Sequence, residues 1–139
     1  MCIHDAYGSI FAISGLDLQS HIADAMRADG IPFNFEHSMI AKSMARRIIM
    51  SKSDNTTKKY FNVFQNWCKY CESKQFAKLP ASPMCIAIYI TELLDKGSSY
   101  HTISAIVYAV KWVHSINNFT DPTDNSFIKN LLESAKRTA

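Results

Sequence analysis

The stretch Ser53–Cys71, SDNTTKKYFNVFQNWCKYC, decides the fold because it carries the clearest helical pattern of the chain. Its apolar residues recur at spacings of three and four, as they must on one side of an α-helix. This apolar stripe consists of Tyr60, Val63, Phe64, Trp67 and Cys71. The opposite face consists largely of Lys58, Asn62, Gln65 and Lys69. With Ser53 as N-cap and Asp54 in the first turn, the stretch predicts a long amphipathic helix whose aromatic side is buried.

Three more helices are predicted after this one. They run from Pro83 to Lys96, from Ser98 or Ser99 to about Asn117-Asn118, and from Asn125 to about Lys136. Ser82-Pro83 supplies a cap and a first-turn proline, and Gly97 is suited to a left-handed helix end. A turn at Asp121-Pro122 precedes the last helix. No segment predicts a pair of strands, so the four helices and their short connections predict an all-α bundle.

The first 50 residues predict a less regular extension, and residues 51–139 the main domain. Residues 1–15 show no period and contain two glycines, which predicts poor order or loose docking. A helix is predicted over 16–29, with Leu18, Ile22, Ala25 and Met26 on one side and Gly30-Ile31-Pro32 ending it. A second is predicted from Glu36 to Met50. Its positions at helical spacing are Met39 or Ile40, Ser43 or Met44, and Arg47 or Ile48.

Charge is distributed unevenly along the chain. Residues 1–41 contain one basic and five acidic residues, whereas residues 42–139 contain fourteen basic and seven acidic ones. Such an asymmetry favours a polyanion partner for the C-terminal two-thirds, although a lysine-rich solvated helix face would give the same count.

The longest N-terminal apolar run, Ile10 to Ile13, is far shorter than a signal-peptide core, and no run approaches the roughly 18 residues of a membrane-spanning helix. These observations predict an intracellular chain, nuclear if its source is eukaryotic. Its four cysteines, Cys2, Cys68, Cys71 and Cys85, are then expected to be reduced.

The Cys68-x-x-Cys71 pair raises the question of a metal or redox site. A structural zinc site needs four ligands, commonly as two close pairs, and the sequence offers no second pair. Redox pairs of this spacing lie at a helix N-terminus, where the dipole lowers the thiol pKa, and this pair lies near a C-terminal end. We therefore expect structural cysteines packed beside Trp67 and no metal. A zinc or redox protein is the least favoured function.

Candidate catalytic residues are few. His114 ends an apolar stripe and is expected to be a hydrogen-bonded core residue rather than a base. His101 lies in the first turn of its helix and is expected to be exposed, where it either contacts a phosphate or is simply solvated. The sequence contains no glycine-rich phosphate loop, no Gly-x-Ser-x-Gly turn and no His-Glu-x-x-His. It therefore predicts no self-contained active site and no cofactor.

Basic and hydroxyl side chains gather at two predicted helix starts. The first set is Lys52, Ser53, Thr56, Lys58 and Lys59, and the second is Ser98, Ser99, Tyr100, His101 and Thr102. Helix N-termini carry unpaired N–H groups that bind anions. Two such termini on one surface would suit duplex DNA, whose phosphates accept from these donors. A plain solvated face is about equally compatible with this composition.

The order of several motifs resembles a known family. The motifs are Ser53-x-x-Thr56, Trp67-Cys68, Leu79-Pro80-Ala81-Ser82-Pro83, Ile88-Tyr89-Ile90 to Leu94 and Gly97, Ser99-x-x-Thr102-Ile103, His114, and Asp121-Pro122. They are similar to the core-binding domain of tyrosine recombinases, the family of phage integrases, Xer and Cre-like enzymes and related mobile elements. The resemblance covers about residues 51 to 138.

The resemblance implies a SAM-like four-helix domain that forms half of a clamp around recombination-site DNA. It implies that the first helix presents Thr56, Lys58 and Lys59 to DNA and the third presents Tyr100, His101, Thr102 and Ala105. Relatives often carry a long basic or amide side chain where this sequence has His101 and Ala105. Phosphate contact is therefore the better-supported role for the third helix.

In this family, cleavage is performed in a second domain by an Arg, a Lys, a His-x-x-Arg, a His or Trp, and a tyrosine nucleophile, whose charged transition state is stabilised by the positive groups. No such set occurs up to Ala139, and none of the six tyrosines is expected to be a nucleophile. The expectation is a domain that binds DNA in recombination or integration without cutting it, and is not itself an enzyme.

The alternative function is a helical protein-interaction module derived from such a domain. Some relatives use an additional helix before the four for contact between protomers. The helix at 36–50, with its Met and Ile residues, could serve such self-association, and packing on its own bundle is an equal alternative.

Overall fold

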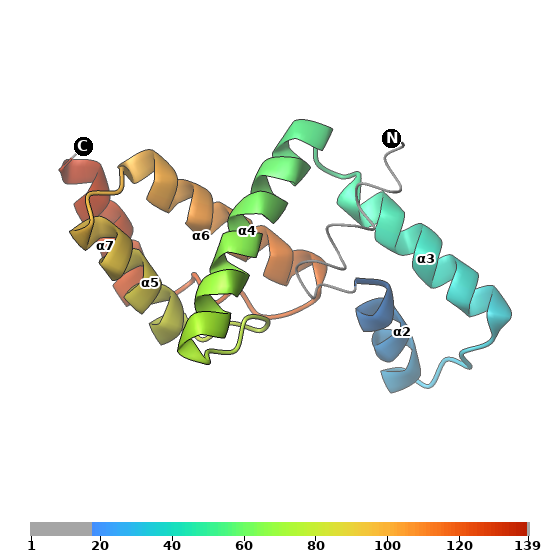
Figure 1. Cartoon of the computed structure of the whole chain (residues 1–139). Coiled ribbons are helices and arrows are strands. Elements are labelled where there is room, and N and C mark those ends of the chain that lie inside the picture. Colours follow the sequence, from blue (N-terminus) through green and yellow to red (C-terminus); the bar gives the residue numbers. More distant parts are fainter. Residues whose placement is uncertain (1–17, 139) are drawn as a thin grey trace. The chain divides into compact units, whose positions relative to one another are not determined.

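The computed structural model describes residues 18–138 (Figure 1). Its helices are α2 (Leu18–Ala28), α3 (Phe35–Ile49), α4 (Asp54–Lys74), α5 (Pro83–Asp95), α6 (Tyr100–Ile116) and α7 (Ser126–Arg137). Within these residues the only extended pairing is an isolated bridge between Lys78 and Ala81. The prediction of an all-α fold is confirmed. The predictions for residues 1–15, and for the first two residues of the helix over 16–29, lie outside the described residues.

The backbone forms two compact units, Met1–Lys59 and Tyr60–Ala139, which divide within α4. The division into an extension over 1–50 and a DNA-binding domain over 51–139 remains a prediction. In the part of the chain that the structure describes, no helix is both long and apolar enough to cross a bilayer.

The described part of the first unit contains α2, α3 and the start of α4. Gly30 adopts a φ of +76° after α2, a left-handed conformation that glycine adopts without strain. Asn34 then caps α3 by accepting the N–H of His37 at 2.9 Å. Helix α2 packs against α3. Gly30, which ends α2, and Asn34, which caps α3, explain why a turn separates the two helices.

The predicted apolar side of α2 is only partly buried, and the Met and Ile residues of α3, for which packing on the bundle and contact between protomers were equal alternatives, are largely exposed. In α2, Leu18 and Ala23 are buried and Ala25 is exposed. In α3, the buried residues are Ala41, Ala45 and Ile49, while Met39, Ile40 and Met44 are 40–49% exposed. Small residues spaced by four allow a neighbouring backbone to approach closely, and large side chains on that strip would hold it away.

In the second unit, α5 packs against both α6 and α7, and α6 also packs against α7. The predicted helix starts and ends are confirmed. Ser82 is the N-cap of α5 with Pro83 at its first position, and Gly97, which follows the helix, has a φ of +94°. Asn118 ends α6 with a φ of +63°, and Asn125 caps α7 through its side-chain oxygen. Each signal is local, which is why the sequence alone predicts it.

The aromatic side of α4 faces the core of the second unit, as the opening stretch predicts. Phe64, Trp67 and Cys71 are fully buried, whereas Tyr60 and Val63 are half-buried. The centre of the stripe is shifted toward Phe61, Phe64 and Cys68. Phe61 packs edge-on against Trp112 of α6, with ring centroids 5.4 Å apart.

Candidate nucleic-acid interface

The start of α4 is built around Ser53, which precedes the helix in the first unit. Its hydroxyl oxygen accepts the N–H of Thr56 at 3.3 Å, and its own O–H donates to the Thr56 hydroxyl at 2.9 Å. Lys52, Lys58 and Lys59 are exposed around this cap, and Thr56 is half-buried. The helix start therefore presents hydroxyl and ammonium donors to solvent.

The start of α6, in the second unit, repeats this arrangement. Ser99 is the N-cap and accepts the N–H of Thr102 at 3.2 Å, and the two hydroxyl groups lie 3.2 Å apart. His101 and Thr102 are exposed, and Tyr100 is half-buried. The prediction that His101 is exposed is confirmed.

Both predicted sets of contact residues thus lie at serine-capped helix starts with a threonine three residues later. The structure brings Ser53 together with Thr56, and Ser99 together with Thr102, within their own units. Because a cap satisfies only one of the first N–H groups of a helix, others at each start remain oriented along the axis toward an incoming anion.

The two helix starts differ in local charge. Helix α4 has Asp54 in its first turn, whereas α6 has no acidic residue there. A carboxylate at the positive end of a helix stabilises that end and opposes a phosphate at the same place. At α4, Lys52, Lys58 and Lys59 must therefore offset Asp54, while the α6 start offers dipole and hydroxyl donors without opposition.

Several lysines outside these two helix starts are already paired with acids. Lys78 lies 2.8 Å from Glu72, Lys129 lies 2.6 Å from Asp124, and Lys74 lies 3.8 Å from Glu92. The hydrogen bond from Lys78 lowers the pKa of Glu72, as that from Lys129 lowers the pKa of Asp124. Within residues 18–138, the ion pairs leave out Lys52, Lys58 and Lys59. Their ammonium groups are therefore available to a partner.

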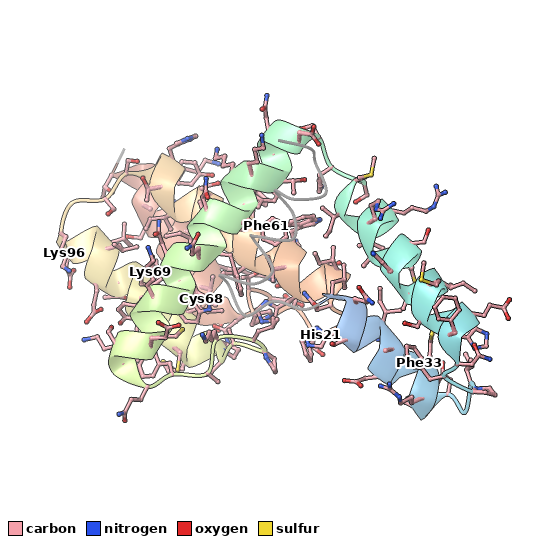
Figure 2. The ribbon with its side chains drawn as sticks, turned by 45° about the vertical axis from the view of Figure 1, so that its right-hand side comes forward. His21, Phe33, Phe61, Cys68, Lys69 and Lys96 are labelled. Atoms are coloured by element: carbon pink, nitrogen blue, oxygen red, sulfur yellow. The ribbon has the colours of Figure 1, made fainter. Side chains whose placement is uncertain are left out.

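The sequence reasoning overlooked part of the solvent face of α4. Asn55 and Asn66 are exposed there, in addition to the expected Asn62. Helix periodicity places these residues on the face opposite the aromatic stripe, so their spacing of seven and four was a usable signal. Cys68 is buried and its neighbour Lys69 is exposed; both are labelled on α4 in Figure 2.

The thiols of the opening stretch belong to the core. Cys68 and Cys71 are buried, at 3% and 0% exposure. Burial raises the pKa of Cys68 to about 11 and that of Cys71 to about 12. A reactive thiol needs a lowered pKa and solvent access, and these two have neither. The prediction that they are structural is confirmed.

His114 is likewise a core residue. It is fully buried; its Nδ1–H donates to the carbonyl oxygen of Val110 at 2.8 Å, and its Nε2 accepts the N–H of Ala81 at 2.8 Å. Both ring nitrogens are engaged in holding the chain together. The expected hydrogen-bonded core histidine is confirmed.

The comparisons with known proteins complete this description. No family model matches the chain. A curated protein of Selenomonas ruminantium, described as an integrase/recombinase xerD homolog, is 32% identical over 98 residues, which cover 66% of this chain. The match covers 28% of that protein, so the chain spans well under two thirds of its length. This similarity supports a relationship between the chain and integrase-type recombinases.

Proposed function

We propose that this chain binds double-stranded DNA as the core-binding domain of a tyrosine recombinase or integrase. The observation that carries the proposal is the repeated, serine-capped helix start with exposed donors, once at α4 and once at α6. Hydroxyl groups, ammonium groups and helix N–H groups are the donors that proteins commonly direct at DNA phosphates. The similarity to an integrase/recombinase supports the same proposal.

In this proposal the contacts are made by Lys52, Ser53, Thr56, Lys58 and Lys59 at α4, and by Ser99, Tyr100, His101 and Thr102 at α6. Most of these side chains are short or end in an ammonium group, so they fit phosphate contact better than bidentate reading of a base. The chain as given supplies DNA binding and not strand cleavage, because its sequence lacks a His-x-x-Arg and the accompanying catalytic set. Cleavage in the parent enzyme would belong to a separate catalytic domain.

A DNA titration at two salt concentrations tests the proposal. If about 4 to 6 phosphates are contacted, affinity for a duplex should fall about 10² to 10³-fold between 50 and 200 mM salt, because the condensed counterions are released on binding. Fluorescence anisotropy of a labelled duplex measures it. Absence of binding at 50 mM salt would refute the proposal.

The double change Lys58→Glu, Lys59→Glu is expected to weaken duplex binding about 10 to 100-fold at 100 mM salt, by a similar factor for unrelated sequences, since phosphate contacts carry little sequence information. The slope of log affinity against log salt should become shallower by about 2. Lys69→Glu, Lys111→Glu makes the same charge change on exposed residues about three or more turns beyond the starts of α4 and α6, and should have a much smaller effect. Asp54→Asn should strengthen binding. Equal losses in the two double variants would argue against a defined contact at α4.

A second function, self-association through α3, is favoured by one observation. Phe35 is 82% exposed and Met39 is 49% exposed on this helix, although both are apolar. The second unit has an apolar groove of about 520 Å³ between α5 and α7, whose lining includes Met84, Ile88 and Phe127. The α3 face of one copy can enter the groove of another, which is a head-to-tail contact.

Size measurement on single-site variants tests this contact. Phe35→Glu disables the helix face and Phe127→Glu disables the groove, so each variant alone should be a monomer under conditions in which the unchanged chain associates. A mixture of the two retains one working contact and should form a dimer and nothing larger. Light scattering on a size-exclusion column distinguishes these results. A monomeric unchanged chain up to high micromolar concentration, or a mixture that stays monomeric, would refute the contact.

A further inference from the structure

The connection between α3 and α4 brings the end of one helix against the start of the next within the first unit. The Thr57 hydroxyl donates a long hydrogen bond, 3.5 Å, to the carbonyl oxygen of Ile49. Thr57 is 0% exposed and Ile49 is 1% exposed. The N–H of Met50 and the N–H of Ser51 bond back to α3, at the carbonyl oxygens of Arg46 and Ile48. The last turn of α3 and the first turns of α4 therefore meet at this connection.

Along the chain, five basic residues flank this connection, which we call the α3–α4 corner: Arg46, Arg47, Lys52, Lys58 and Lys59. Each lies within three residues of Ile49 or Thr57 along the chain, and each is exposed. Asp54 is the only acidic residue between positions 42 and 59. Among residues 18–138, the ion pairs involve none of the five.

The position of Arg46 and Arg47 has a local explanation, because basic side chains in the last turn stabilise the negative end of a helix dipole. That explanation does not extend to Lys52, Lys58 and Lys59, which lie at the positive end of the next helix. The carbonyl oxygens of Arg46 and Ile48 already accept backbone N–H groups. A partner carrying closely spaced negative charges, as a duplex backbone does, stabilises all five cations together.

From the α3–α4 corner we infer that Arg46 and Arg47 bind DNA phosphates next to those contacted from the start of α4. The inference rests on the proposed function and extends it, since it makes the extension helix α3 part of the DNA-binding surface. Arginine suits this role because its planar guanidinium donates two parallel hydrogen bonds to one phosphate.

The salt dependence of duplex binding tests the inference on the full chain. Arg46→Gln, Arg47→Gln is expected to make the slope of log affinity against log salt shallower by about 2, and to reduce the loss of affinity between 50 and 200 mM salt by about tenfold. Lys69→Gln, Lys111→Gln removes the same charge from exposed positions about three or more turns beyond the starts of α4 and α6, and should leave the slope within about half a unit. Arg46→Lys, Arg47→Lys preserves the charge and should keep the slope of the unchanged chain. Far-UV circular dichroism verifies that all variants remain helical.

If the slope of log affinity against log salt for Arg46→Gln, Arg47→Gln equals that of the lysine control, the inference is overturned. The proposed function would still stand in that case, provided that the unchanged chain binds duplex DNA. No binding by the unchanged chain at 50 mM salt would overturn both.

Discussion

Replacing Trp67 with alanine is expected to lower the free energy of unfolding by about 3–5 kcal/mol. The indole is fully buried, and its ring centroid lies 5.4 Å from that of Tyr89 and 6.1 Å from that of Tyr70. Its Nε1–H also donates a 3.0 Å hydrogen bond to the carbonyl oxygen of Lys78, which ties α4 to the loop before α5. Small domains are stable by about 5–15 kcal/mol, so this one change removes a large part of that stability. Urea unfolding followed by circular dichroism measures the loss.

Trp67→Phe is the matched control, because it keeps a buried aromatic ring and removes the N–H donor. It should cost about 1–3 kcal/mol, from the unsatisfied carbonyl oxygen of Lys78 and the smaller volume. Trp67→Ala should lose DNA binding only where it is unfolded, and should bind DNA again at temperatures at which it is folded. A cost below about 1 kcal/mol for Trp67→Ala would contradict the position of the indole in the core.

The parts of this fold that the sequence predicted are those governed by local signals. Ser99 and Asn125 begin helices because a cap needs only the N–H groups two or three residues later, and Pro83 begins α5 because its fixed φ suits the first helical position. Gly97 and Asn118 end helices because they tolerate a positive φ. The aromatic stripe of α4 was predicted for a similar reason, since its period is read within a single helix.

The parts that the sequence left open depend on which element packs where. Met39, Ile40 and Met44 recur at helical spacing on α3, and the sequence did not decide between packing on the chain's own bundle and contact with a partner. The buried strip is formed instead by Ala41, Ala45 and Ile49. Sequence periodicity indicates that a helix has an apolar side. It does not indicate which residues of that side are buried, because small residues can make the contact while larger ones beside them remain exposed. The exposed Phe35 and Met39 then become candidates for a partner.

In the candidate site, too, some residues could be predicted from local signals and others could not. The hydroxyl donors at Ser53 and Ser99 were predictable because capping is local. The contribution that we propose for Arg46 and Arg47 was not, because it is argued from the contact between Thr57 and Ile49, which joins two helices across a turn. Helix-end arginines with no tertiary context indicate only a favourable dipole interaction.

Lowering the pH from 7.5 to 5 is expected to destabilise the second unit through His114. The ring accepts from the Ala81 N–H at Nε2 and donates to the Val110 carbonyl oxygen at Nδ1, so a second ring proton would put two donors face to face. Burial lowers the pKa of His114 below its usual value of 6.5, and this effect outweighs the opposing ones of the Val110 carbonyl oxygen and the Asp121 carboxylate. As the pH falls, His114 therefore binds a proton in the unfolded chain before it does so in the folded chain. The contribution of neutral His114 to the free energy of unfolding is fully present above about pH 6.5. It is lost as the pH falls below that value, by up to about 1.4 kcal/mol per pH unit, until the pKa of His114 in the folded chain is reached.

Urea unfolding midpoints measured between pH 5 and 7.5 test this expectation. The window stays above the range in which the ion-paired carboxylates Glu72 and Asp124 titrate, because the pKa of each is lowered. His114→Gln is the non-titrating control: its amide can accept from the Ala81 N–H and donate to the Val110 carbonyl oxygen. It should be less stable at pH 7.5, because the ring packed edge-on against Phe64 and Phe119 is lost, and it should have a flatter pH dependence. If stability depends on pH equally in the unchanged chain and in His114→Gln, another group is titrating. The neutral form of His114 would then not be what stabilises the contact between α6 and Ala81.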